Sequence, residues 1–123
     1  MTDPASLATE EYCYLTTTGR VTGSPHEIEI WFALRGSTLY MLSGGGDRAD
    51  WVKNLRQNPR VTVLINGEAF EGRARESADG EEDDLTRRRL VEKYERVPGH
   101  LAAWRRNALP IVVDLDRGGT EAP

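Results

Sequence analysis

A run of three glycines follows a short apolar segment and precedes a segment with helical spacing. It stands in the stretch MLSGGGDRADWVKNLRQNP (41–59), where Ser43 comes directly before Gly44, Gly45 and Gly46. Glycine loses more backbone entropy on folding than other residues, so three together indicate a positive φ angle or a close approach of the backbone. Successive amides in such a turn can converge on an anion, and a following helix N-terminus adds about half a positive charge. A phosphate is one candidate guest, and a purely structural turn is the alternative.

The glycine turn matches neither of the two common phosphate-binding motifs. The dinucleotide pattern requires a parallel βαβ unit, and the P-loop requires a Lys-Ser/Thr pair, which is missing here. On spacing alone, ligand binding and a structural turn both remain open.

A second polar loop stands directly before an alternating segment. The stretch TTTGRVTGSPH (16–26) combines two glycines, two groups of hydroxyl residues and Arg20. Hydroxyls supply neutral donors, and a guanidinium suits bidentate contacts with an anion. Alone this stretch is simply a polar loop. Together with the glycine turn it favours an anion-binding site built from two loops.

Other residues that could do chemistry have simpler interpretations. Glu27 and Glu29 lie two apart on a strand, which places them about 7 Å from each other, but the sequence offers no aromatic platform for a sugar. We expect a solvated or interface face there, and Trp31 on the same face favours an interface. The lone Cys13 has no histidine at metal spacing, so we expect a buried apolar side chain and no metal site. His100 is expected in a surface loop, with an acceptor pocket as the alternative.

Composition narrows the class of protein. A chain of 123 residues fits one domain over 1–123 that buries roughly 65% of its unfolded surface. The formal charge of −4, with acids and bases interspersed, gives no basic footprint for nucleic acid. The apolar runs fall far short of the roughly 20 residues of a membrane span, and the N-terminus is acidic, unlike a signal peptide. We therefore expect a cytoplasmic protein with no nucleic-acid partner and no transmembrane segment.

The elements that must position the two loops alternate between strands and helices. Apolar and β-branched patterns bounded by turn residues predict strands over 12–19, 25–34, 38–43, 60–65, 68–75 and 109–116. Helical spacing predicts helices over 47–58, 79–97 and 101–107. Mostly antiparallel strands with helices outside imply an α+β domain around a closed or partly closed barrel. Residues 1–11 and 117–123 are expected to be flexible ends.

Local signals set several of these boundaries. Asp47 is placed to cap the first helix, and Asn58-Pro59 should end it. Asn66-Gly67 between two strand patterns predicts a tight hairpin. In 25–34 the side chains alternate, so the apolar ones share one face; these are Ile28, Ile30, Phe32 and Leu34.

The ordered motifs resemble a known family. LTTTGRVTGSPHEIEIWF, LYMLSGGGDRADWVKNLRQNPRVTVLI, EGRAR and AWRRNALPIVV follow in the order seen in deazaflavin-dependent nitroreductase-like proteins of the flavin/deazaflavin oxidoreductase superfamily. The resemblance spans 14–115. It implies a mostly antiparallel split β-barrel like that of the pyridoxamine 5′-phosphate oxidases, with two to three peripheral helices and usually a homodimer. It also implies reduced coenzyme F-420 as the hydride donor, with an electron-poor quinone, nitroaromatic or enone as acceptor.

The resemblance also implies which residues hold the cofactor. Arg20 would pair with its phosphate or acidic tail, and Trp51, Asn54 and Leu55 match a W..NL motif beside it, although Trp51 and Leu55 suit a core equally well. A positioned hydroxyl or imidazole, Ser43 or His26, would be the catalytic proton donor or polarising group. The full set of expected cofactor-binding residues is Arg20, Thr22, His26, Ser43, Gly44, Gly45, Gly46, Arg48, Trp51, Asn54 and Leu55.

Two departures from the family keep other functions open. Val21 and Gly44 stand where relatives often carry lysine, although Arg48, Lys53 and Arg56 could compensate. FMN, with one phosphate and no acidic tail, is therefore the alternative cofactor. Only Tyr94 remains of a tyrosine set that some relatives use for substrate, so a non-catalytic carrier of a flavin, haem or lipid is the third hypothesis.

Overall fold

Seven strands form one antiparallel sheet in the computed structural model, which describes residues 3–116. The strands are β1 (Cys13–Thr18), β2 (Pro25–Ile30), β3 (Ala33–Arg35), β4 (Thr38–Ser43), β5 (Arg60–Ile65), β6 (Glu68–Glu76) and β7 (Leu109–Leu115). The helices are η1 (Pro4–Leu7), η2 (Gly46–Arg48), α1 (Asp50–Gln57), α2 (Gly80–Tyr94) and α3 (Ala102–Asn107), where η marks a 3-10 helix. Of the ends expected to be flexible, residues 1–2 and 117–123 lie outside the described part.

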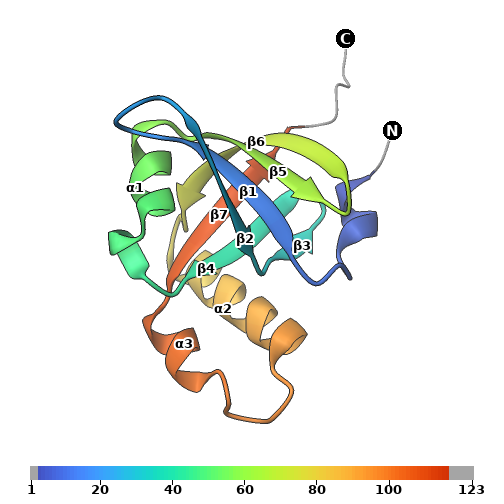
Figure 1. Cartoon of the computed structure of the whole chain (residues 1–123). Helices are drawn as coiled ribbons and strands as arrows, with labels where there is room; N and C mark the ends of the chain where they lie inside the picture. The colour runs from blue at the N-terminus through green and yellow to red at the C-terminus, as the bar shows by residue number, and fades with distance from the viewer. Residues whose placement is uncertain (1–2, 117–123) are drawn as a thin grey trace.

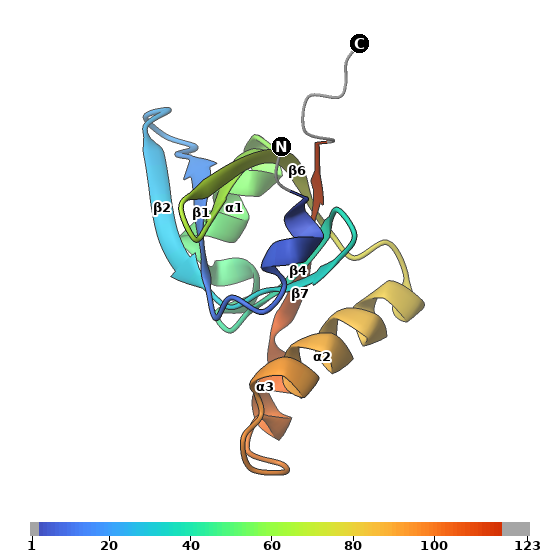
Figure 2. The same cartoon turned by 90° about the vertical axis from the view of Figure 1, so that its right-hand side faces the viewer.

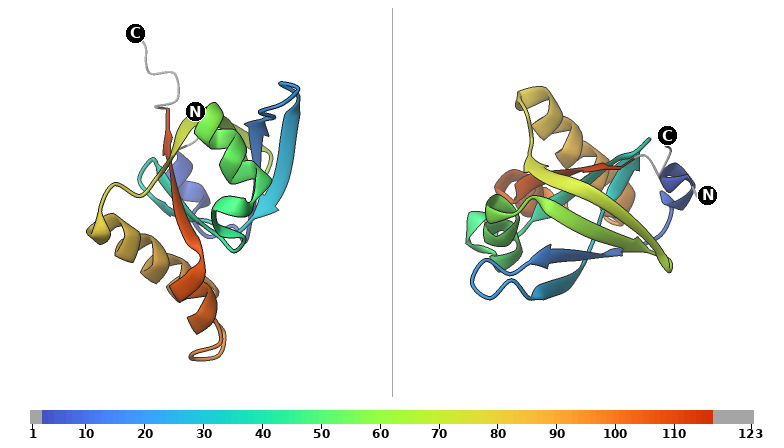
Figure 3. Two further views of the ribbon diagram at one scale, coloured as in Figure 1. Left: turned by 90° about the vertical axis from the view of Figure 1, so that its left-hand side faces the viewer. Right: turned by 90° about the horizontal axis from the view of Figure 1, so that it is seen from above.

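The sheet curls into a half-barrel with strand order β2-β1-β5-β6-β7-β4-β3, so β2 and β3 are its edges. Figures 1 and 3 show η1 and α1 at opposite ends of the curl, while α2 and α3 stand outside it. Figure 2 shows the same separation from the side. The expected α+β class, a mostly antiparallel and partly closed barrel with three peripheral helices, is confirmed.

The inside of the curl holds the larger hydrophobic core. Because successive side chains of a strand face opposite sides, alternate residues of β1 and β5 point inward. These residues are Cys13, Leu15, Val61, Val63 and Ile65. η1, which carries the core residue Leu7, lies at one end of the core, and α1, which carries the core residues Val52 and Leu55, lies at the other (Figure 3). Cys13 is buried, and burial raises the pKa of its thiol to about 12.

A second core lies on the outer face of the sheet, under α2 and α3. Tyr40 and Leu42 of β4 point into this core, whereas Leu39 and Met41 of the same strand point into the barrel. β4 is therefore buried on both faces. The helical side of the second core is formed by Leu85, Leu90, Tyr94, Leu101 and Trp104.

The predicted strand over 25–34 is wrong in length. It is two strands, β2 and β3, on opposite edges of the sheet, and the chain crosses between them at Trp31 and Phe32. Ile28 and Ile30 pack against the barrel core, and the fully buried Phe32 enters the same core. The apolar alternation therefore continues through the crossing although the strand does not.

Helix boundaries follow the predicted caps only in part. α2 begins after Asp79, whose carboxylate accepts a hydrogen bond from the amide of Glu82 at 2.9 Å. The predicted cap at Asp47 is wrong, because this residue lies within η2 and Ala49 stands at the start of α1 with no side-chain hydrogen bond. α1 ends at Gln57, directly before Asn58-Pro59, as expected.

Two side chains of α2 hold the crossing at Phe32. The Tyr94 hydroxyl accepts a hydrogen bond from the Phe32 amide (3.0 Å) and lies within donating distance of the carbonyl oxygens of Phe32 (2.9 Å) and Glu11 (2.6 Å). Lys93 Nζ donates to the Phe32 carbonyl (2.8 Å) and lies 3.8 Å from the centroid of the Phe32 ring. The link between the two edge strands is thus fastened to α2.

The position of Lys93 predicts an unusual dependence of stability on pH. Burial lowers the pKa of Lys93 to about 8 from its ordinary 10.5. Between these two values the unfolded chain binds more protons than the folded one, so the contribution of Lys93 to stability rises with pH. We expect the melting temperature of the wild type, minus that of Lys93→Met, to increase from pH 7 to about pH 10, followed by circular dichroism. A difference that stays constant with pH would contradict this assignment.

Candidate functional site

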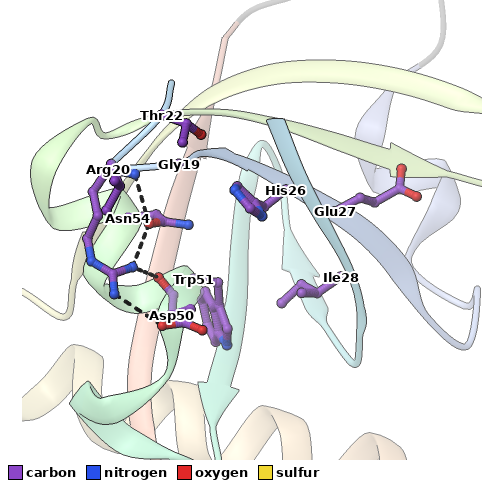
Figure 4. Close-up of a pocket in the computed structure, with 10 residues that line it drawn as sticks. Gly19, Arg20, Thr22, His26, Glu27, Ile28, Asp50, Trp51 and Asn54 are labelled. Atoms are coloured by element: carbon purple, nitrogen blue, oxygen red, sulfur yellow. Dashed lines mark hydrogen bonds and ion pairs between the residues drawn. The ribbon is translucent and has the colours of Figure 1, made fainter. Parts of the chain in front are cut away.

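A hollow of about 450 Å³ opens between the β1–β2 loop, β2 and the start of α1, and is called the first hollow (Figure 4). It is lined by Gly19, Arg20, Val21, Thr22, His26, Glu27, Ile28, Asp50, Trp51 and Asn54. Among them are predicted cofactor-binding residues from two separate segments of the chain: Arg20, Thr22, His26, Trp51 and Asn54. The fold therefore brings the polar loop and the W..NL motif to one site.

Arg20 is the guanidinium of the first hollow, and it already has partners. Nη2 lies 3.2 Å from a carboxylate oxygen of Asp50, and Nη1 donates to Oδ1 of Asn54 at 2.8 Å. The Arg20 side chain is 31% exposed, whereas that of Asp50 is 85% exposed. An anion that enters this hollow therefore meets a guanidinium that is already paired with a solvent-exposed carboxylate.

Asn54 fastens the β1–β2 loop to α1. Its Oδ1 also accepts the backbone amide of Arg20 at 3.1 Å, and its Nδ2 donates to the Thr17 hydroxyl at 3.2 Å. Asn54 is only 3% exposed, so these bonds replace water at a buried amide. The side chain positions the loop and the guanidinium, and this use of its hydrogen-bonding groups was not foreseen from the W..NL motif.

His26 reaches the first hollow because the residue facing it is glycine. A Cβ at Gly19 would lie 2.6 Å from Nε2 of His26 and 3.0 Å from the carbonyl oxygen of Ser24. The imidazole therefore stands over bare backbone, and Figure 4 shows it directed toward the hollow, with Trp51 on the opposite wall. Its exposed ring is free to meet a ligand or an acceptor.

The glycine turn needs only one of its three glycines for its own conformation. Gly46 has a φ of +61°, which disfavours other residues, whereas added Cβ atoms at Gly44 and Gly45 would meet the nearest atoms at 3.8 Å and 3.5 Å, in ordinary contact. The hydroxyl of Ser43 donates to the Gly46 carbonyl at 2.9 Å and closes the turn. The backbone conformation and the packing of the turn therefore do not require glycine at positions 44 and 45.

The remaining predicted site residues lie away from the first hollow. Ser43 is 2% exposed and is not among the residues that line the first hollow. Leu55 is buried in the barrel core, and Arg48 lies exposed in η2. Arg56, one of the cations that could have replaced the missing lysines, instead pairs with Glu76 at 2.9 Å.

A second hollow of about 480 Å³ adjoins β2 and is walled by aromatic rings. It is lined by Glu29, Ile30, Trp31, Leu42, Leu101 and Trp104. The ring of Trp31 stacks on Tyr94 with centroids 4.2 Å apart, and Trp104 stands edge-on to Trp31 at 5.7 Å. Sequence reasoning assigned Trp31 to an interface and gave Trp104 no role, because only the fold brings residues 73 positions apart together.

The glycine turn links the walls of the two hollows. Leu42, directly before the turn, lines the second hollow, and Asp50, at the start of α1, lines the first. Trp104 of the second hollow is the side chain nearest to a Cβ built at Gly44, at 3.8 Å. β2 borders both hollows, with Ile28 in the first and Ile30 in the second. The two hollows therefore lie along one strand, on either side of the turn.

The backbone amides of the glycine turn are suitable hydrogen-bond donors for a phosphate group. Gly44 and Gly45 are exposed, and their amides donate to no backbone acceptor within residues 3–116. The start of α1 follows without a side-chain cap, and its first turn carries the carboxylate of Asp50, which partly offsets the positive charge of the helix start. Backbone amides in this arrangement suit phosphate oxygens.

A family model described as F420H(2)-dependent quinone reductase matches residues 5–116. The chain belongs to that family. As an F420H(2)-dependent quinone reductase family member it is a reductase with coenzyme F-420 as its cofactor, and the resemblance inferred from the sequence is confirmed. The match covers both loops of the site.

Solved structures of low sequence identity share this family member's fold. A conserved hypothetical protein of Mycobacterium tuberculosis has a TM-score of 0.76 at 19% identity, over 95% of this chain and 82% of that one. A putative pyridoxamine 5′-phosphate oxidase of Listeria innocua has a TM-score of 0.70 at 20% identity, over 93% and 90%. An F420-H2-dependent reductase has a TM-score of 0.67 at 24% identity, over 83% and 92%. The split-barrel fold is therefore shared with these proteins.

Two features are absent from the described part of this F420H(2)-dependent quinone reductase family member. Among residues 3–116, no helix is long and apolar enough to cross a membrane. Over the same residues, no three His, Cys, Asp or Glu side chains are grouped so as to hold a metal ion.

Proposed function

We propose that the chain transfers a hydride from reduced F-420 to a flat, electron-poor acceptor of the quinone class. Reduced F-420 supplies the hydride when bound, so the protein must position the reactants, exclude water and deliver a proton. The observation that carries the proposal is the pair of hollows along β2 on either side of an exposed glycine turn.

The first hollow and the glycine turn would hold the cofactor. We assign its phosphate to the amides of Gly44 and Gly45, with Arg20 as the cationic partner. Thr22 lines the same hollow, although its hydroxyl already accepts the Ser24 amide at 3.2 Å. Trp51 supplies an apolar wall for a ring system. Ser43 would act as a positioning residue, because its hydroxyl is committed to the Gly46 carbonyl.

The second hollow would hold the acceptor. Its aromatic and aliphatic lining favours a planar apolar ring, since flat π systems pack well against tryptophan faces and edges. His26 would supply the proton that accompanies hydride transfer to a quinone, because its exposed imidazole lies on the same strand as both hollows. The nitroaromatic and enone acceptors remain alternatives within this proposal.

A homodimer would cover the open side of the half-barrel. β2 is an edge strand with unpaired backbone groups, and Trp31 at its end is 37% exposed. Edge strands of this kind are usually covered or paired in native proteins. A second copy is therefore the proposed partner at this edge.

The glycine turn provides the sharpest test of this function. Gly44→Ala should leave the melting temperature unchanged, because the added Cβ has room beside Trp104. If phosphate oxygens approach this backbone, the same change should weaken F-420 binding about tenfold, equivalent to one lost charge-assisted hydrogen bond. Quenching of tryptophan fluorescence would give the affinity, and oxidation of reduced F-420 by a naphthoquinone would give turnover.

Gly80→Ala is the matched control, since Gly80 opens α2 with no atom within 4 Å of an added Cβ. A parallel titration with FMN separates the two cofactors. If Gly44→Ala binds F-420 as tightly as the wild type, the phosphate does not bind at the turn. Tight F-420 binding without turnover of any quinone would contradict the proposed quinone reduction and favour a non-catalytic carrier.

A further inference from the structure

We propose that Asp50 is a built-in competitor for the anion site, and that its carboxylate lowers the affinity for cofactors whose tails carry several negative charges. The inference rests on the proposed function, in which Arg20 meets a phosphorylated cofactor. It adds a specificity-determining residue that opposes binding instead of contributing to it.

Asn54 and Asp50 hold the Arg20 guanidinium in different ways. Asn54 is buried and accepts hydrogen bonds from both the backbone amide and Nη1 of Arg20, so this attachment is shielded from solvent on the Asn54 side. Asp50 contacts Nη2 at 3.2 Å from a side chain that is 85% exposed. An incoming anion can therefore displace the carboxylate while Asn54 keeps the guanidinium in place.

The charge balance of the first hollow supports a competitive role. Arg20 is the one permanent cation among its lining residues, which also include the acids Glu27 and Asp50. Figure 4 shows the Glu27 side chain pointing away from the hollow, whereas Asp50 lies beside Arg20. The carboxylate of Asp50 therefore neutralises the cation on which an anionic ligand would depend.

No other permanently charged cation lines the hollow to relieve this competition, and His26, which lines it too, adds a positive charge only while it carries the proton that it is proposed to deliver. Lys53 and Arg48 are exposed near the start of α1 but are not among the lining residues, and Arg56 is paired with Glu76. A phosphate has the glycine amides as donors in addition to Arg20, so a ligand with a single phosphate depends less on Arg20 than an acidic tail does. Each further negative charge on a tail near Arg20 must displace Asp50 or be repelled by it. The site is thereby biased toward cofactors with few tail charges.

Asp50→Asn tests this role directly, because it removes the charge and keeps the shape. An exposed ion pair is weak, so we expect F-420 to bind about two- to fivefold more tightly to Asp50→Asn at low salt, with the gain shrinking as salt is raised. The gain should be smaller for FMN, which carries one phosphate and no acidic tail. Calorimetric titration of purified wild type and variant with each cofactor measures both effects.

Asp47→Asn is the matched control, because it removes one acid from the neighbouring 3-10 turn, and no ion pair joins Asp47 to Arg20. In an Arg20→Gln background, Asp50→Asn should give a smaller gain, since the cation for which it competes is gone and only direct repulsion of the ligand by Asp50 is relieved. If Asp50→Asn has a lower melting temperature than the wild type, Asp50→Ser is the second variant to test, because serine also suits a helix start.

Unchanged or weaker binding of both cofactors by folded Asp50→Asn would overturn the inference, as would an equal gain from Asp47→Asn. The proposed function is tested by separate measurements, namely quinone-dependent oxidation of reduced F-420 and the F-420 affinity of Gly44→Ala. If F-420 fails to bind while FMN binds, the proposed function falls, and the FMN affinities of Asp50→Asn, Asp47→Asn and Arg20→Gln still decide the role of Asp50.

Discussion

Asn54→Ala is expected to be the most damaging single change at the candidate site. It removes the acceptor of two Arg20 donors and leaves the Thr17 hydroxyl, which is 1% exposed, without its partner. Losing these bonds should lower the free energy of unfolding by about 2–3 kcal/mol, since each unsatisfied buried group costs about 1–3 kcal/mol. The midpoint of urea unfolding, followed by tryptophan fluorescence, measures this loss.

Asn54→Ala should also weaken cofactor binding without touching the cofactor. Arg20 and the β1–β2 loop would no longer be held against α1, so ordering them would have to accompany binding. Asn107→Ala, at an exposed position of α3, is the matched control and should change neither quantity. A wild-type unfolding midpoint in Asn54→Ala would show that the loop does not depend on this amide.

Tyr94→Phe is expected to have the second-largest effect. The hydroxyl that it removes satisfies the buried amide of Phe32 and lies within donating distance of the carbonyl oxygens of Phe32 and Glu11. We expect a loss of about 2 kcal/mol in stability, because the Phe32 amide would be left buried and unpaired. The same change should alter the near-ultraviolet circular dichroism of Trp31, whose ring stacks on Tyr94.

Tyr40→Phe is the matched control for the loss of a hydroxyl from a largely buried tyrosine. Tyr40 is 4% exposed, and its hydroxyl makes no hydrogen bond to another residue between 3 and 116. Its replacement should change stability by less than about 0.5 kcal/mol. Equal losses in the two variants would mean that the crossing at Phe32 is not held by the Tyr94 hydroxyl.

Local chemistry made several elements predictable from the sequence. Asn66-Gly67 forms the expected hairpin turn between β5 and β6, and both residues have positive φ angles, 48° and 81°. Asn58-Pro59 ends α1 where expected, and the acids at the start of α2 include the capping Asp79. In each case a few adjacent residues determine the backbone.

The crossing at Trp31 and Phe32 was not predictable in this way. The segment 25–34 alternates like one strand, but its two halves pair with strands far apart in the sequence, β1 and β4. The pattern reports which side chains are buried and not which strand lies beside them. The burial of β4 on both faces was not predictable either, because it depends on a helix, distant in the sequence, that packs on the outer face of the strand.

For the site, the sequence identified the segments but not the partners within them. The two loops and the W..NL motif do gather around the first hollow and its adjacent turn, and their ligand roles remain proposals. The internal use of Asn54 and Ser43, the Arg20–Asp50 pair and the ring contacts of Trp104 depend on distances across the fold. Spacing along a chain carries no such distances.

The place of β7 in the sheet has a consequence for how the protein is made. β7 joins β6 to β4, so it connects the group β2-β1-β5-β6 to the pair β4-β3, yet within residues 3–116 it follows the other six strands of the sheet. During translation the ribosome delivers residues 109–115 after both groups, which until then expose the unpaired edges of β6 and β4. Barrel closure therefore waits for these residues, and chaperones or a slow ribosome would act on a nascent chain with two open sheet edges.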